Sequence, residues 1–281
     1  MSMSGGIDIA LIQTRTPATA RDALAHVEPL IRQAASTGAR FILTPEGTNV
    51  LEQRRERRNA AVIDEDQDVA VLGLRRLAAE LGVWLLIGSA IVRSGRAGEG
   101  RAANRSLLVD SSGAITARYD KLHVFDVDLP NGERYRESAT VRPGDRAVAA
   151  DTPWGRLGLT VCYDIRFPHL HRQLAKAGAS MIAIPAAFTA PTGEAHWETL
   201  LRARAIETGA FVLAPAQGGL HEDGRRTWGR STVVGPWGEI IAKADHDEPC
   251  IVTAKLDMEA VRRARAAVPA LTHDRDFLPV S

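Results

Sequence analysis

The sequence GLTVCYDIRFP, residues 158–168, joins a buried strand to a helix through a tight turn. The apolar run 157–161 predicts the strand, and a helix is expected at 169–177. Cys162 ends the strand, and a residue at such a turn points its side chain above the sheet, near backbone N–H groups. The helix N-terminus also favours thiolate over thiol, so we expect a lowered pKa for Cys162. The turn makes Cys162 a candidate nucleophile; the alternative is a buried cysteine that acts as a small apolar side chain.

Short apolar runs alternate with segments of helical periodicity on the N-terminal side of this turn. Such alternation is typical of strands that are covered by helices, so it predicts an α/β fold. The strands are expected at 7–13, 40–44 and 84–90, and the helices at 20–36 and 69–81.

Turn sequences between apolar runs predict three β-hairpins, which mix antiparallel strands into the sheets. One turn is Ser-Ser-Gly at 111–113, and Pro-Trp-Gly forms the other two at 153–155 and 236–238. The paired strands are expected at 106–109 with 114–119, 146–151 with 157–161, and 231–234 with 239–242. Further strands at 181–185 and 211–216, separated by a helix at 194–208, complete a layered sandwich.

Composition and charge are those of an ordinary globular chain of 281 residues. The net charge of +1 gives no field that would attract nucleic acid or an anionic membrane, and the basic run 54–58 is typical of a solvated helix face. Two cysteines, Cys162 and Cys250, do not make a disulfide framework, and we find neither a signal peptide nor a membrane-spanning run. We therefore expect a cytoplasmic protein with one domain over 1–281 and a C-terminal tail from about residue 271.

Two more reactive side chains stand at predicted strand ends. Glu46 follows the apolar run 41–45, and Lys121 follows the strand 114–119. Side chains beyond the ends of neighbouring strands meet at one edge of a sheet, where the sites of α/β proteins form. A thiol nucleophile needs a base, and both Glu46 and a histidine such as His123 remain candidates at this point.

Three blocks of the sequence match one known family: TPEG around Glu46, YDKLHVFDVDLPNG around Lys121 and GLTVCYDIRFP around Cys162. In order and spacing they resemble the Glu-Lys-Cys blocks of the nitrilase, or carbon-nitrogen hydrolase, superfamily. Downstream, GASMIAIPAAFTAPTGEAHWETLLRARAIETGAFVLAPAQGGLH and GRSTVVGPWGEIIAKA are similar to the branch that contains deaminated glutathione amidase and ω-amidase. The resemblance covers nearly the whole chain and implies a four-layer α-β-β-α sandwich with mixed parallel and antiparallel sheets.

The resemblance also implies a role for each matching residue. Cys162 would be the nucleophile, Glu46 the general base, and Lys121 the cation that stabilises the oxyanion. The backbone N–H of Tyr163 would complete the oxyanion hole, and Glu137 would position the substrate and support the other three. A carboxylate whose pKa is raised by burial can take the thiol proton, so no histidine, cofactor or metal is required. The family's helix contacts further imply a homodimer or a larger homo-oligomer.

Three further residues near the predicted site are candidates for substrate binding, and two of them also have a structural interpretation. Phe188 and Thr189 are candidate pocket walls, with core packing left open for Phe188. Arg166 is expected either to bind a substrate carboxylate or to pair with Asp164 or Glu137, and we prefer the structural ion pair.

The expected function is hydrolysis of the amide bond of a small carboxylate-bearing substrate, with deaminated glutathione preferred. The alternatives are ω-amidase activity on α-ketoglutaramate, a nitrilase activity, and a non-catalytic binding protein on the same fold. One departure bears on this choice: Gly-Arg-Ser at 229–231 stands where the resembled branch has Gly-His-Ser. Arg230 adds charge and bulk, which puts either the pocket shape or the oligomer contacts in question.

Overall fold

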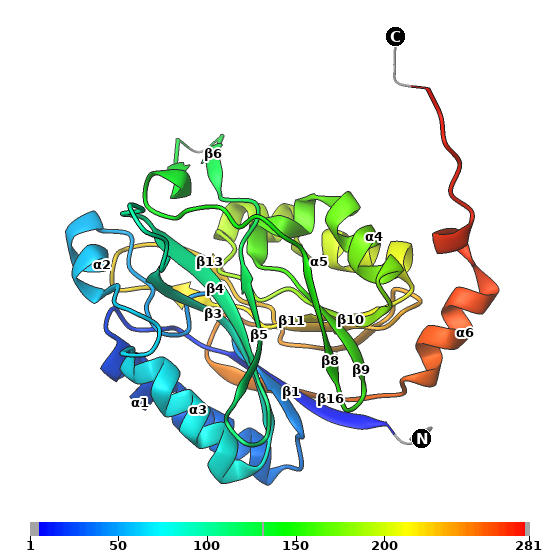
Figure 1. Cartoon of the computed structure of the whole chain (residues 1–281), viewed down its shortest axis with the longest axis horizontal. Helices are drawn as coiled ribbons and strands as arrows, with labels where there is room; N and C mark the ends of the chain where they lie inside the picture. The colour runs from blue at the N-terminus through cyan, green and yellow to red at the C-terminus, as the bar shows by residue number, and fades with distance from the viewer. Residues whose placement is uncertain (1–5, 131, 279–281) are drawn as a thin grey trace.

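A computed structural model describes residues 6–130 and 132–278 of the protein. Two six-stranded sheets pack face to face, and helices cover the outer face of each sheet (Figure 1). The layers run α-β-β-α, and each sheet contains both parallel and antiparallel neighbours. The predicted fold class is therefore confirmed.

The first sheet has the strand order β16-β1-β2-β3-β4-β5. Its middle strands β1, β2 and β3 are parallel, while β16, β4 and β5 run antiparallel to their neighbours. The strands are β1 (Ile7–Gln13), β2 (Phe41–Leu43), β3 (Trp84–Arg93), β4 (Ala102–Val109), β5 (Ile115–Asp120) and β16 (Cys250–Leu256).

The second sheet repeats this plan with the order β15-β14-β11-β10-β9-β8. Here β9, β10 and β11 are parallel, and antiparallel pairs flank them on both sides. The strands are β8 (Val148–Thr152), β9 (Gly155–Leu159), β10 (Ala179–Ala183), β11 (Phe211–Ala214), β14 (Thr232–Val234) and β15 (Ile240–Lys243).

The covering helices are α1 (Ala20–Ser36) and α3 (Val69–Leu81) on the first sheet, and α4 (Pro168–Lys176) and α5 (Ala190–Thr208) on the second (Figure 1). The ends of α3 show why the sequence predicts such helices well. The Asp68 side chain accepts hydrogen bonds from the first backbone N–H groups, and Gly82 ends the helix in the left-handed conformation.

The main core lies between the two sheets and continues under α5. Phe41 and Leu43 of the first sheet belong to the same buried cluster as Leu159 and Met181 of the second. Trp197 on α5 is also part of it. Burial of these apolar side chains away from water is the main force that holds the layers together.

Gly88 marks a close approach between the layers beside the end of β2. A Cβ atom at this position would lie 1.7 Å from the Thr44 carbonyl oxygen and 2.5 Å from the Pro185 side chain, so only glycine fits. The segment 44–46 is thereby held against β3, and this segment carries Glu46.

Two short hairpins and one helix were not predicted. The hairpins are β6 (Asp126–Asp128) with β7 (Arg134–Arg136), and β12 (Gly218–Leu220) with β13 (Arg226–Trp228); the helix is α6 (Glu259–Ala267). Their strands are only three residues long, which is too short for an apolar alternation to be seen. The basic run forms α2 (Arg55–Ala61), and α5 begins four residues before its predicted start. Within the described ranges, no helix combines the length and apolarity needed to cross a bilayer.

Candidate active site

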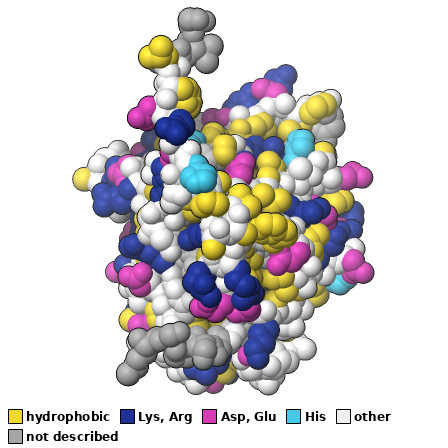
Figure 2. Space-filling view, turned by 90° about the vertical axis from the view of Figure 1, so that its right-hand side faces the viewer, with side chains coloured by type: hydrophobic (Ala, Val, Ile, Leu, Met, Phe, Trp, Pro, Cys, Tyr) yellow, Lys and Arg dark blue, Asp and Glu magenta, His cyan; other side chains and the backbone are white. Residues whose placement is uncertain are grey.

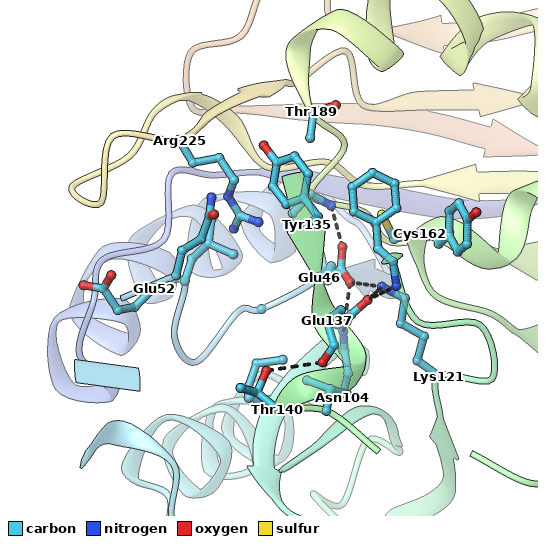
Figure 3. A pocket seen from close by; sticks show the side chains of 18 of the residues that line it. Glu46, Glu52, Asn104, Lys121, Tyr135, Glu137, Thr140, Cys162, Thr189 and Arg225 are labelled. Carbon is cyan, nitrogen blue, oxygen red and sulfur yellow. Dashed lines mark hydrogen bonds and ion pairs between the residues drawn. The ribbon is translucent and has the colours of Figure 1, made fainter. Parts of the chain in front are cut away.

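Three strand ends from the two sheets bring Glu46, Lys121 and Cys162 into one pocket (Figure 3). Glu46 follows β2, Lys121 follows β5, and Cys162 is the first residue of the 3-10 turn η2 (Cys162–Arg166) after β9. The pocket is a cavity of about 350 Å³, a size usual for a small-molecule site.

Lys121 is held between two carboxylates. Its Nζ lies 2.9 Å from Glu46 Oε1, and 2.9 Å and 3.1 Å from the two carboxylate oxygens of Glu137. Only 2% of Lys121 is exposed. Burial alone would lower its pKa, but Glu137 and Glu46 raise the pKa of Lys121 well above its ordinary value, so the ammonium form persists.

Glu46 is fixed at both of its carboxylate oxygens. Besides Lys121, Oε1 accepts a hydrogen bond from Asn104 Nδ2 at 2.8 Å, and Oε2 accepts one from the Ala187 backbone N–H at 2.8 Å. Burial would raise the pKa of Glu46, but the charge of Lys121 and hydrogen bonds from Lys121, Cys162 and Asn104 lower it below 4.5. The expected raised pKa was wrong, because the sequence alone does not weigh burial against an adjacent ammonium group.

Cys162 has a backbone conformation that is unusual for a residue other than glycine, with φ of 50°. Its N–H donates to the Pro185 carbonyl at 2.9 Å, which fixes this turn against the next strand. Burial and then the negative charge of Glu46 raise the pKa of Cys162 well above its ordinary value. The expected lowering was wrong because burial and the charge of Glu46 outweigh any effect of the helix N-terminus, which lies six residues further on at Pro168. The resting pair is therefore a thiol beside a carboxylate.

Glu137 lines the same cavity as Cys162 and is largely buried. It opens the 3-10 turn η1 (Glu137–Ala139), and 16% of its side chain is exposed. Its Oε2 accepts a hydrogen bond from the Phe125 N–H at 2.6 Å, while Lys121 binds the same carboxylate. This places Glu137 directly behind the ammonium group.

Asn104 is a site residue that the sequence analysis missed. It lies on β4, is 2% exposed, and donates from Nδ2 to both Glu46 and Glu137 at 2.8 Å and 3.2 Å. One amide group thus orients both carboxylates that hold Lys121. The sequence gives little signal for it, because Asn104 stands beside Arg105 and Ser106 and before the predicted strand 106–109. Its role follows from its burial, since a buried amide needs hydrogen-bond partners.

Asp164 connects the loops that carry Lys121 and Cys162, and it too was missed. Its fully buried carboxylate accepts hydrogen bonds from the Tyr119 hydroxyl at 2.6 Å and the His123 backbone N–H at 3.0 Å, and its Oδ1 lies 2.7 Å from His123 Nδ1. Tyr119 and His123 stand two residues before and after Lys121, while Asp164 stands two residues after Cys162. Asp164 therefore sets the position of the ammonium group relative to the thiol.

Phe188 and Thr189 both line the cavity. Phe188 also packs on Trp197, with ring centroids 5.0 Å apart, so its side chain contacts both the cavity and the core. The Thr189 hydroxyl bonds to that of Thr192 at 2.7 Å at the start of α5.

Arg166 lies behind the cavity wall. Its guanidinium carbon is 5.9 Å from the ring centroid of Tyr163 and 5.3 Å from that of Phe188, and both rings line the cavity. Arg166 itself is not among the described residues of the lining. The preferred ion pair with Asp164 or Glu137 was wrong, because the neighbours described above bind those carboxylates.

Arg230 also lies outside the described lining of the cavity, so it does not alter the pocket directly. Its guanidinium carbon lies 5.1 Å from the Trp228 ring centroid, and its carbonyl accepts a hydrogen bond from Trp197 Nε1 at 3.0 Å. Its φ is 60°. Arg230 thus joins β13 to α5.

The described ranges contain no group of three or more His, Cys, Asp or Glu side chains arranged to hold a metal ion. The charged groups at the base of the cavity bind one another instead.

Comparison with known proteins agrees with this geometry. The carbon-nitrogen hydrolase family matches residues 8–266. The deaminated glutathione amidase of Yersinia enterocolitica is 43% identical over 269 residues, which cover 95% of this chain and 93% of that protein. The chain belongs to the carbon-nitrogen hydrolase family, whose members hydrolyse carbon–nitrogen bonds other than peptide bonds.

Two solved structures are also similar. The Caenorhabditis elegans NitFhit protein superposes with a TM-score of 0.88 at 33% identity; the match covers 98% of this chain and 66% of that one. An amidase mutant from Nesterenkonia sp. AN1 has a TM-score of 0.76 at 27% identity, with 94% of this chain and 98% of that chain covered. The Nesterenkonia structure shows acrylamide added to its active-site cysteine by a Michael addition.

Proposed function

We propose that the protein hydrolyses the amide bond of deaminated glutathione through a thioester on Cys162, releasing 2-oxoglutarate and cysteinylglycine. The observation that carries this proposal is the ammonium group of Lys121, held by Glu46 and Glu137 in the pocket that contains Cys162. The name of the Yersinia relative supports the choice of substrate.

In the first step, Glu46 takes the proton of the Cys162 thiol as the sulfur attacks the amide carbon. Since the pKa of Cys162 is raised and that of Glu46 is lowered, a free thiolate is disfavoured and proton transfer accompanies the attack. Lys121 and the backbone N–H of Tyr163 stabilise the negative charge that develops on the carbonyl oxygen.

In the second step, Glu46 returns the proton to the amide nitrogen, the carbon–nitrogen bond breaks, and the amine leaves. A water molecule, deprotonated by Glu46, then attacks the thioester carbon. The sulfur leaves and regains its proton from Glu46, while the acyl group departs as a carboxylic acid. Glu46 is oriented for these transfers by the Asn104 and Ala187 hydrogen bonds.

The substrate proposal is tested by comparing three compounds at equal concentration. Deaminated glutathione is expected to show a kcat/KM about 10-fold or more above that of 2-oxoglutaramate, because a cavity of this size accommodates an N-substituted amide. An aliphatic nitrile is the third compound. Release of cysteinylglycine, ammonia and carboxylic acid would be measured. Preference for 2-oxoglutaramate would favour the ω-amidase alternative, and hydrolysis of neither amide would contradict the proposed function.

The pH dependence of the reaction is expected to depend on Asn104. The ionised form of Glu46 is the active base, so kcat/KM of the wild type should fall only at pH values below about 4.5. Asn104→Ala removes a donor to the carboxylate, which raises the pKa of Glu46 and moves this acid limb to higher pH. The limb would be measured between about pH 3.5 and 8. Asn59→Ala, at an exposed asparagine on α2, is the control. If the acid limb of the kcat/KM profile lay at the same pH in Asn104→Ala as in the wild type, the proposed effect of Asn104 on the pKa of Glu46 would be contradicted.

We also infer a homodimer or larger homo-oligomer. Apolar side chains gather on the face that carries α6 (Figure 2), and Ile206, Trp237 and Val268 are large apolar side chains left exposed in the single chain. Sedimentation of a monomer at micromolar concentration would contradict this inference.

Two further expectations remain proposals: a cytoplasmic location and a single domain with a tail from about residue 271. Both Cys162 and Cys250 are free thiols, which fits a reducing compartment. β16 pairs with β1, so segments near both ends of the sequence share one sheet. Cell fractionation tests the location, and two separate unfolding transitions would contradict a single domain.

A further inference from the structure

Among the described residues that line the cavity, every charged side chain but one has a partner. Lys121 binds its two carboxylates, and Arg58 is not free. The remaining pairs are Glu52 with Arg54 at 2.5 Å, and both Arg134 and Arg136 with Asp128 at 3.4 Å and 2.8 Å.

Arg225 is the exception. It lines the cavity, yet its guanidinium group forms no ion pair with any carboxylate in the part of the chain that the structure describes. Its Nε is buried and has no hydrogen-bond partner there. A buried donor without a partner is costly, and a charged one more so, which points to a ligand group that completes the site.

The backbone that carries Arg225 is firmly fixed. Arg225 directly precedes β13, in the turn that joins it to β12. The Asp223 carboxylate accepts hydrogen bonds from the Arg225 N–H at 2.9 Å and from the Gln53 N–H at 2.8 Å. Thr227 then pairs with Thr189 on the cavity wall through a β-bridge. A guanidinium group on such a support loses little freedom when it binds an anion.

Figure 3 shows Arg225 and Lys121 on opposite sides of Glu46. In the proposed reaction the carbonyl oxygen points toward Lys121, and the departing nitrogen takes its proton from Glu46. The amine part of the substrate therefore extends past Glu46, away from Lys121 and toward the side of the cavity where Arg225 lies.

We propose that Arg225 binds a carboxylate on the departing amine, so that the preferred substrates are N-substituted amides whose amine part is a short peptide with a free C-terminal carboxylate. This inference rests on the proposed amidase function and adds the group that selects the amine. A guanidinium group suits this task because its planar N–H donors match both oxygens of a carboxylate.

The test combines three substrates with three variants. The substrates are the 2-oxoglutaryl amide of a dipeptide, the same compound with its C-terminus converted to a carboxamide, and the primary amide 2-oxoglutaramate. The variants are Arg225→Gln, Arg225→Lys and the control Arg226→Gln, whose exposed side chain pairs with Asp247. Each kcat/KM is compared with that of the wild-type chain.

For the wild type, conversion of the carboxylate to a carboxamide is expected to lower kcat/KM by about 10- to 100-fold. Arg225→Gln should lower kcat/KM for the free acid by a similar factor, with little further loss on the carboxamide and none on the primary amide. Arg225→Lys should restore part of the activity, and Arg226→Gln should match the wild type.

Equal losses on all three substrates would overturn the inference, because they would indicate a structural role or a contact with the acyl part. An unchanged kcat/KM for the free acid in Arg225→Gln would overturn it as well. Either result leaves the amidase function intact, whereas a wild-type chain that cleaves none of the three amides would contradict the proposed function itself.

Discussion

Cys162→Ala is expected to abolish thioester formation and to lower kcat by about 10⁴-fold or more. The sulfur is the proposed attacking atom, and the remaining groups around Lys121 only position and polarise the amide. Rapid quenching followed by mass measurement of the intact chain should show an acyl adduct on the wild type and none on the variant. The variant should still bind substrate, since the cavity and the pairs of Lys121 are retained.

Cys250→Ala is the matched control. Cys250 is the other thiol of the chain, half-buried at the start of β16, and it does not line the described cavity. Its removal should leave both the adduct and the turnover rate unchanged. An adduct that persists in Cys162→Ala and disappears in Cys250→Ala would reverse the assignment of the nucleophile.

The layered fold was predictable because its central elements are long enough to carry a periodic signal. β1, α1 and α3 have the predicted bounds, because apolar spacing marks all three and the N-cap residues Thr19 and Asp68 begin the two helices. The β6–β7 hairpin was not predictable. Its strands have the sequences DVD and RYR, in which charged residues flank a single central residue, so that no apolar alternation can be recognised. Such short polar hairpins are held by their surroundings and not by local preference.

The proposed catalytic residues stand at strand ends, and the matching sequence blocks identified them together. Of the supporting residues, Glu137 was identified from the resemblance, but Asn104 and Asp164 were not, because these two differ from ordinary polar positions only through what they contact. The same holds for Arg225, because an arginine without a carboxylate partner among the described residues of the cavity lining can be recognised only once the ion pairs of the other charged residues there are known. The predicted directions of the pKa shifts of Glu46 and Cys162 were wrong for a related reason. Each shift depends on the sum of burial and neighbouring charges.

Lys121→Met is expected to cost both activity and stability. Loss of the cation that faces the oxyanion should lower kcat by about 10²- to 10³-fold. The substitution also leaves Glu46 and Glu137 without the ammonium group that both contact, and removing one partner of a buried ion pair costs about 3–5 kcal/mol of unfolding free energy. Urea unfolding followed by fluorescence measures this loss. Lys243→Met is the control, because its exposed pair with Glu198 contributes less than about 1 kcal/mol.

The pH dependence of this loss of unfolding free energy shows whether unpaired charge or lost packing destabilises Lys121→Met. Without Lys121, two adjacent carboxylates raise the pKa of at least one of them above its unfolded value of 4.5. The folded variant then binds more protons than the unfolded chain, so its stability falls as the pH rises through the raised pKa. The loss of unfolding free energy in Lys121→Met, relative to the wild type, should therefore be larger at about pH 8 than at about pH 5. In the double variant Lys121→Met, Glu137→Gln, one of the two charges is gone, so most of the stability should return while the activity stays lost. Equal deficits at both pH values would mean that lost packing, and not unpaired charge, destabilises the variant.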